Sequence, residues 1–125
     1  MAGVLAELGF YALAGQPKSP RDLIAEVRAG EAMGLGTAFI SERYNVKEAA
    51  TLSGAAGAVT ERIDIATAAT NHNTRHPLVT ASYATTMHRL TGGRFTLGLG
   101  RASRCCRTRS ASPASPPRSS RTSSD

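Results

Sequence analysis

Short apolar runs along the chain alternate with longer stretches in which apolar positions recur at helical spacing. The runs predict four strands, over residues 8–14, 37–41, 63–69 and 95–99. The stretches between the runs predict three helices, over about 20–33, 46–59 and 77–91. Strands and helices are therefore expected in strict alternation.

Capping residues set the expected starts of the three helices. Ser19 and Asp22 have the spacing of a capping box, and Asn45 with Glu48 repeats that spacing before the second helix. His76 stands before a proline that suits the first helical position, so His76 is the expected cap of the third helix. These positions predict Ser19, Asn45 and His76 as the three caps.

The connections between the predicted elements are short, which favours parallel strands joined by right-handed crossovers. The fold class is therefore α/β. An eight-stranded α/β barrel typically needs about 250 residues. Residues 1–101 accordingly predict either a small open sheet or one half of a barrel.

The charge of the chain divides at about residue 101. Residues 1–100 carry nine Lys and Arg against eight Asp and Glu, whereas residues 101–125 carry six Arg against one Asp. The final segment is rich in Ser, Arg and Pro and has no large aliphatic or aromatic residue, so it cannot form a core. We expect a folded domain at 1–101 and a disordered tail at 102–125.

The sequence disfavours both insertion into a membrane and secretion. No run approaches the roughly 18 apolar residues of a membrane helix, and the first ten residues do not resemble a secretory signal. The two cysteines, Cys105 and Cys106, are adjacent, which is neither a disulfide framework nor a metal-binding spacing. A cytoplasmic protein without membrane contact is expected.

Ligands of parallel α/β proteins bind beyond the carboxyl ends of the strands, so the segments that follow the strands are the candidate sites. His72 and His76 in one of them are four residues apart, but Pro77 disfavours a helix that would bring both to one metal, and no metal site is expected. Glu42 and Arg43 follow the second strand. They are either a solvated ion pair or part of a site.

Three motifs together resemble the bacterial luciferase-like family: Phe39-Ile40-Ser41-Glu42-Arg43, Arg75-His76-Pro77, and the run Leu-Thr-Gly-Gly-Arg-Phe-Thr-Leu-Gly-Leu-Gly at 90–100. The resemblance covers about residues 7–101. It is strongest to oxidoreductases that use the deazaflavin coenzyme F-420, with FMN-dependent monooxygenases as near relatives. It implies a (β/α)8 TIM barrel, of which this chain would hold the first four strands and three helices.

The resemblance also implies a function and a coenzyme site. Family members transfer hydride between F-420, or alternatively FMN, and a small organic substrate. The coenzyme lies across the strand ends, and many relatives have a non-prolyl cis peptide against its ring, which would fall near Ala68 and Ala69. The implied coenzyme-binding residues are Glu42, Arg43, Ala68, Ala69, Thr70, Asn71, Gly100 and Arg101.

The resemblance assigns no catalytic residue in this chain. Deazaflavin members often have an acidic residue followed by His after the second strand, the His assisting proton transfer, and these positions are Glu42 and Arg43 here. Arg is permanently charged and is a poor general acid, so Arg43 is expected to bind an anionic part of the coenzyme instead.

The family pattern stops after Arg101. Supplying one lost base before the codon of Ala102 gives a family-like continuation, so we interpret residues 102–125 as read out of frame and the chain as a truncated, inactive fragment. A homo-oligomer is a further expectation, since half-barrels can pair. The alternative function is a small nucleic-acid-binding module that uses the Arg-rich tail, although the tail lacks aromatic residues for base stacking.

Overall fold

The computed structural model describes residues 5–101, and their strands and helices alternate as predicted. Residues 1–4 and the predicted tail at 102–125, with both cysteines, lie outside the described residues. The elements are β1 (Leu5–Tyr11), α1 (Asp22–Ala32), β2 (Leu35–Ile40), α2 (Ala49–Val59), β3 (Asp64–Thr67), β4 (Thr70–Asn71), α3 (Pro77–Leu90), β5 (Phe95–Thr96) and β6 (Leu99–Gly100). The α/β prediction is confirmed.

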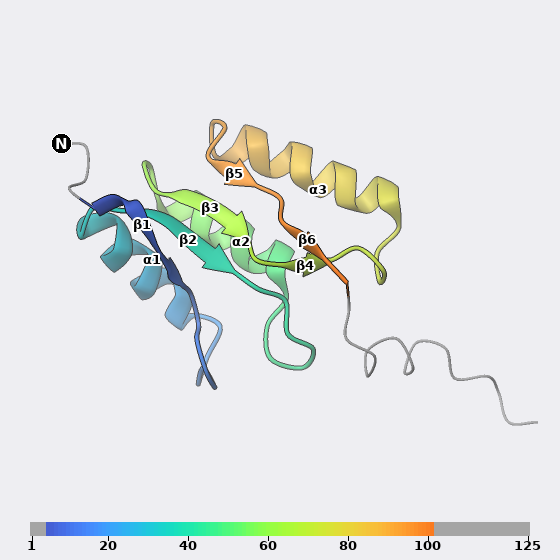
Figure 1. The fold of residues 1–125 in the computed structure, drawn as a ribbon, viewed down its shortest axis with the longest axis horizontal. Coiled ribbons are helices and arrows are strands. Elements are labelled where there is room, and N and C mark those ends of the chain that lie inside the picture. The colour runs from blue at the N-terminus through green and yellow to red at the C-terminus, as the bar shows by residue number, and fades with distance from the viewer. Residues whose placement is uncertain (1–4, 102–125) are drawn as a thin grey trace, which may run out of the picture.

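The main sheet has four parallel strands in the order β1-β2-β3-β5 (Figure 1). A second, two-stranded parallel sheet is formed by β4 and β6, which continue the chain beyond β3 and β5. Each long crossover between neighbouring strands of the main sheet contains one helix. No helix in residues 5–101 is long and apolar enough to cross a membrane.

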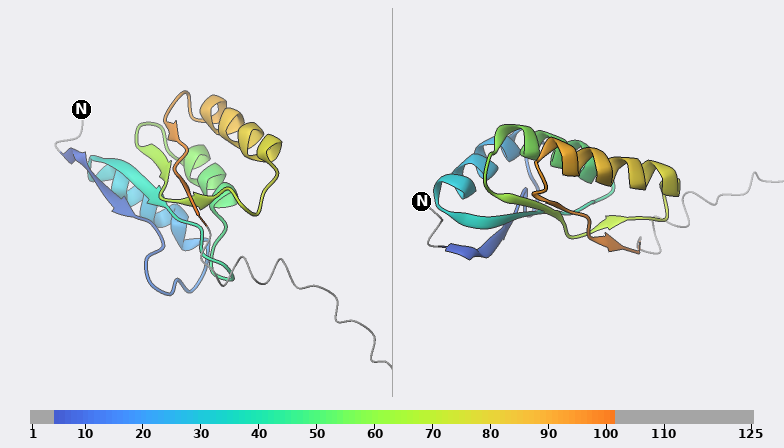
Figure 2. Two further views of the ribbon diagram at one scale, coloured as in Figure 1. Left: turned by 45° about the vertical axis from the view of Figure 1, so that its right-hand side comes forward. Right: turned by 90° about the horizontal axis from the view of Figure 1, so that it is seen from above.

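All three helices cover the same face of the main sheet (Figure 2). Ala38 on β2 is the register partner of Phe10 and Ile65, and this row packs toward the helices. Side chains alternate along a strand, so the next row, which contains Tyr11, Phe39, Ala66 and Thr96, is on the opposite face. Tyr11 is 42% exposed and Phe39 is 37% exposed. We call this second surface the open face.

The core lies between the sheet and the first two helices. Its buried members come from β2, from β3 and the residue before it, from the segment that follows β1, and from the apolar sides of α1 and α2; they include Leu23, Val27, Ile40, Ile63 and Ile65. Small residues line α2 and allow it to approach the sheet closely, with Ala49 and Ala56 completely buried. The open face has no such layer among the described residues.

The first strand lies nearer the amino terminus than predicted, at 5–11 instead of 8–14. The chain leaves the strand conformation at Leu13, whose φ angle is 52°. Ala12 N still donates to Phe39 O, at 2.9 Å, but Leu13 N donates to the Glu26 carboxylate, at 2.7 Å. A carboxylate from α1 thus replaces the neighbouring strand as acceptor and ends β1.

The third and fourth strands, predicted as continuous, are each interrupted. Thr67 Oγ1 donates to Gly98 O, at 2.9 Å, and accepts from Gly98 N, at 2.8 Å. This side-chain exchange replaces the ladder between β3 and β5 before pairing resumes between β4 and β6. A Cβ atom at Gly98 would lie 1.9 Å from Thr67 O, so only glycine fits there. The Ala68–Ala69 peptide bond at the interruption is cis, as the resemblance implied.

Two of the three predicted caps are wrong. Helix α1 begins at Asp22 without a side-chain cap, because Ser19 Oγ accepts from Arg21 N, at 3.2 Å, in the turn before the helix. Glu48 caps α2 in place of Asn45, with its carboxylate accepting from two backbone N–H groups of the first turn. The His76 cap is confirmed, since His76 Nδ1 accepts from Leu78 N at 3.2 Å.

The open face and the outer edges of β1 and β5 predict that the 125-residue chain self-associates. Unpaired strand edges and exposed apolar side chains both promote association. Size-exclusion chromatography with light scattering should show dimers or larger species, and Phe39→Lys on the open face should shift them toward monomer. Thr85→Lys on the exposed surface of α3 is the control and should change little. A monodisperse monomer with sharp cooperative unfolding would contradict this expectation.

Candidate functional site

The segments that follow the second, third and fourth strands of the main sheet meet at one edge. Thr70 is paired with Leu99 and Asn71 with Gly100, and Thr70 N donates to Gly98 O at 3.0 Å. Glu42 N donates to Ala69 O at 3.1 Å, which adds the segment after β2. We call this region the strand-end site.

A charged network ties the strand-end site together. Arg75 Nη2 donates to Glu42 Oε1 at 3.1 Å and also to the Glu48 carboxylate, while Arg75 Nη1 donates to Thr70 Oγ1 at 2.6 Å. The Thr70 hydroxyl in turn donates to the other Glu42 oxygen. The side chains of Arg75 and Glu42 are only 15% and 17% exposed. One guanidinium therefore serves two carboxylates in a largely water-excluded position.

This arrangement argues against a solvated ion pair between Glu42 and Arg43. They are not an ion pair with each other, because the carboxylate of Glu42 binds Arg75. Arg43 turns the other way, toward the loop after β1, where its Nη1 donates to Gly15 O. The two side chains leave the same strand end in different directions, as expected for consecutive residues of an extended segment.

Glu48 joins the capping of α2 to this network. Burial alone would raise the pKa of its carboxyl group. The N–H groups of Thr51 and Ala50 and the Arg75 charge outweigh that effect and lower the pKa. Glu48 is therefore an anion at neutral pH, and the network needs the Arg75 cation.

The remaining predicted site residues present small or polar groups at the same edge. A Cβ atom at Gly100 would lie 3.2 Å from the Ala69 Cβ, so the backbone at Gly100 and the backbone at Ala69 approach closely. Asn71 Oδ1 accepts from Thr74 N at 3.1 Å and from Thr74 Oγ1 at 2.5 Å, which uses its oxygen within the loop. Arg101 is exposed, at the end of the described residues.

A second polar cluster lies beside the strand-end site and contains residues that the sequence did not indicate. The hydroxyls of Tyr11 and Ser41 share a hydrogen bond, and Lys47 Nζ lies 4.1 Å from the centroid of the Tyr11 ring. Nothing in the local pattern distinguishes Lys47 from a solvated lysine. The buried Arg75 was visible only as part of a motif, and its partners are 27 and 33 residues away.

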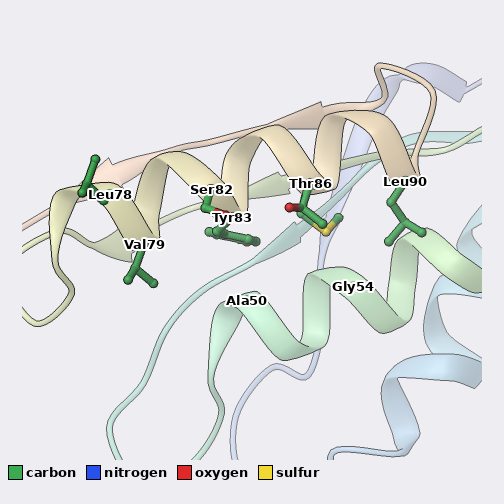
Figure 3. A pocket seen from close by; sticks show the side chains of 9 residues that line it. Ala50, Gly54, Leu78, Val79, Ser82, Tyr83, Thr86 and Leu90 are labelled. Carbon is green, nitrogen blue, oxygen red and sulfur yellow. The ribbon is translucent and has the colours of Figure 1, made fainter.

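Two hollows on the surface of residues 5–101 bear on the site. One lies against the strand-end site, with Glu42, Arg43, Lys47 and Glu48 in its lining. The other is an apolar groove between α2 and α3, on the helix side of the sheet; Leu78, Val79, Ser82, Tyr83, Thr86 and Leu90 line its α3 side (Figure 3). Tyr83 Oη donates to Ser53 Oγ at 3.0 Å, and burial raises the pKa of Tyr83. No cluster of metal ligands occurs among residues 5–101.

Comparison with known proteins gives one family. A family model described as luciferase-like monooxygenase matches residues 3–115. A 5,10-methylenetetrahydromethanopterin reductase from Methanopyrus kandleri is 30% identical over 96 residues, which are 77% of this chain and 28% of that protein.

Solved structures give the same result for the fold. The coenzyme F-420-dependent tetrahydromethanopterin reductase of Methanopyrus kandleri has a TM-score of 0.69 at 25% identity, covering 86% of this chain and 30% of that one. The oxygenating constituent of a 3,6-diketocamphane monooxygenase from Pseudomonas putida, in complex with FMN, has a TM-score of 0.69 at 22% identity. That match covers 82% of this chain and 31% of the other. The chain thus spans less than a third of these relatives.

The charged network predicts a large stability effect of Arg75. Arg75→Met leaves the largely buried Glu42 carboxylate without its cation and removes the partner of the half-exposed Glu48, and should lower the free energy of unfolding by about 1 to 3 kcal/mol. Urea unfolding followed by circular dichroism measures this change. Arg89→Met on the exposed surface of α3 is the matched control and should stay within about 0.5 kcal/mol. Equal effects of the two substitutions would show that the network is dispensable.

Proposed function

The chain belongs to the luciferase-like monooxygenase family, whose barrel fold it holds in part, and we propose that its strand-end site binds coenzyme F-420 for hydride transfer with a small organic substrate. The relative from Methanopyrus kandleri supports this proposal, since it is named as a coenzyme F-420-dependent reductase. FMN is the alternative coenzyme, supported by the Pseudomonas putida structure, which contains it.

One observation carries the proposal: the β4–β6 pairing and the Glu42 N to Ala69 O hydrogen bond bring small residues and polar residues of three strand ends to one edge. Ala68 is exposed and Ala69 and Gly100 are partly exposed, and their small side chains suit the approach of a flat ring to the backbone. The polar groups at the same edge, on Asn71 and Arg43, suit the ring edge and an anionic group. The residues present therefore fit a deazaflavin or flavin.

The chain's own residues would hold and orient this coenzyme. Arg43 would bind an anionic part of it, and Asn71 would make polar contacts at its ring, with Arg101 near its phosphate. Thr70 is completely buried and its hydroxyl is bonded to Glu42 and Arg75, so Thr70 would support the site by holding the strand end in place. Glu42 would act through Thr70 and Arg75, which fix the third strand end. When bound, the coenzyme supplies the hydride-transfer chemistry of its ring. The substrate would be a small molecule that lies over the same strand ends.

We further propose that the chain by itself has little or no oxidoreductase activity. The main sheet of the described residues has four strands. The part of the chain that matches the relative in sequence covers 28% of that protein. The walls that select a substrate in a closed barrel come from all the strand ends. Sequencing the gene beyond codon 101 tests the proposed change of reading frame, and we call the product of the restored frame the longer protein.

The coenzyme preference is tested by equilibrium fluorescence titration of the longer protein. We expect F-420 to bind more tightly than FMN, by about tenfold or more, which corresponds to about 1.4 kcal/mol. A clear preference for FMN would assign the protein to the monooxygenase branch of the family.

The role of Arg43 is tested by the same titration. Arg43→Ala should weaken F-420 binding by about 1 to 3 kcal/mol, the cost of losing a hydrogen bond to a charged group. Arg28→Ala, on the exposed side of α1, is the control and should leave the affinity unchanged. Unchanged affinity in the Arg43 variant would remove Arg43 from the coenzyme site.

A further inference from the structure

The polar cluster beside the strand-end site has no role in holding the coenzyme as proposed above. Tyr11 is the last residue of β1, Ser41 directly follows β2, and Lys47 precedes α2. The hydroxyls of Tyr11 and Ser41 share a hydrogen bond, and the Lys47 ammonium lies over the Tyr11 ring. Three elements thus converge on one phenol.

Lys47 is a buried cation without a carboxylate partner among residues 5–101. It is 6% exposed, and its Nζ donates to Ala12 O at 2.9 Å and to Leu13 O at 3.1 Å. Lysines are rarely buried unless they are paired with an acidic group. The acidic group that lies against Lys47 is the Tyr11 phenol, whose ionised form would complete such a pair.

The phenol is accessible where a ligand of the strand-end site would lie. Tyr11 is 42% exposed and lies on the open face, in the same row as Phe39 and Thr96. Its hydroxyl reaches Ser41, whose neighbour Glu42 is bonded through its backbone to Ala69. The hydroxyl of Tyr11 is therefore held over the end of β2, next to the proposed ring position.

The surroundings of Tyr11 favour loss of its proton. Burial raises the pKa of the phenol, but the hydrogen bonds with Ser41 and Lys47 and the positive charges of Lys47 and Arg43 outweigh burial, so the pKa is lowered. The charged groups that act on Tyr11 are these two cations, one from the segment before α2 and one from the end of β2. A pKa closer to the working pH makes a side chain a better general acid and base.

We propose that Tyr11 is the proton donor of the hydride-transfer reaction, with Ser41 and Lys47 as positioning residues. The inference rests on the proposed function. It also supplies the proton that Arg43 cannot give, since a guanidinium does not lose its proton in a protein.

The proton step balances with a reduced deazaflavin as the hydride donor. As the hydride forms a bond to the carbon of a substrate C=O or C=N group, the π-electron pair moves to the oxygen or nitrogen. That atom takes the Tyr11 proton, and the O–H bond of Tyr11 breaks. Ser41 donates a hydrogen bond to the resulting phenolate, Lys47 stabilises its charge, and a proton from water restores the phenol.

The chain is well suited to a direct test because it has three tyrosines and no tryptophan. A pH titration of tyrosinate absorbance should show that the tyrosine with the lowest pKa is lost in Tyr11→Phe and kept in Tyr44→Phe and Tyr83→Phe. Lys47→Met should reduce the ionisation constant of Tyr11 by about tenfold, which is one pKa unit. Ser41→Ala should reduce it in the same direction.

Circular dichroism establishes that each variant folds. If Lys47→Met does not fold, Ser41→Ala decides the outcome, because it removes one hydroxyl and leaves the buried ammonium in place. The inference is overturned if Tyr11→Phe retains the lowest transition, or if the folded variants titrate like the original chain.

A second measurement separates this inference from the proposed function. In the longer protein, Tyr11→Phe should remove one limb of the pH profile of hydride transfer and slow it by about a hundredfold. The affinity for F-420 should stay within about twofold. Failure to bind F-420 would overturn the proposed function and, with it, the role of Tyr11 in hydride transfer, even if the pKa of Tyr11 is low. Normal binding with an unchanged pH profile in Tyr11→Phe would overturn the inference alone.

Discussion

The guanidinium of Arg75 is the group on which the arrangement of the strand-end site depends. It binds the carboxylates of Glu42 and Glu48 and the hydroxyl of Thr70, and so connects the end of β2, the start of α2 and β4. Charges this poorly hydrated are stable only when paired, because removing one partner leaves a buried charge uncompensated. Arg75 is itself positioned by the start of α3, where His76 caps the helix. The residue that precedes the cap of α3 thus connects three other segments.

The one-sided sheet explains why a candidate site and an uncovered sheet face occur together in the described residues. Helices α1 to α3 bury one face, and the core there resembles that of any small α/β domain. The open face carries Tyr11 and Phe39, which are too exposed for a core and too apolar for an ordinary solvated surface. In a closed barrel that face would line the interior. The part of it at the carboxyl ends of the strands would form the bottom of the active-site pocket.

Much of the fold could be predicted from sequence, because apolar runs and helical spacing report directly on which side of each element is buried. The interruptions of the third and fourth strands could not, since they arise from an exchange between the Thr67 side chain and the Gly98 backbone, 31 residues apart. The second helix cap was misassigned for a local reason. Asn45 takes a positive φ angle of 62° in the turn, and the longer Glu48 side chain reaches the N–H groups instead.

The candidate site was predictable in position and only partly in its contacts. The rule that ligands bind beyond strand ends selects the edge at which Glu42, Ala69 and Gly100 meet. Adjacency in sequence suggested an ion pair between Glu42 and Arg43, yet consecutive side chains diverge from a strand end, and the true partner of Glu42 is 33 residues away. Buried Lys47 and the Tyr11–Ser41 hydrogen bond have no sequence signal, because they depend on how three loops pack.

The central claim is that the strand-end site, and not the apolar groove between α2 and α3, holds the coenzyme. A crystal structure of the longer protein with coenzyme F-420 tests it most directly. The account predicts the ring against Ala69 and Gly100, with the Arg43 guanidinium within hydrogen-bond distance of an anionic group. A coenzyme seated against Leu78 and Tyr83, or one that makes no contact with residues 68–71, would contradict it.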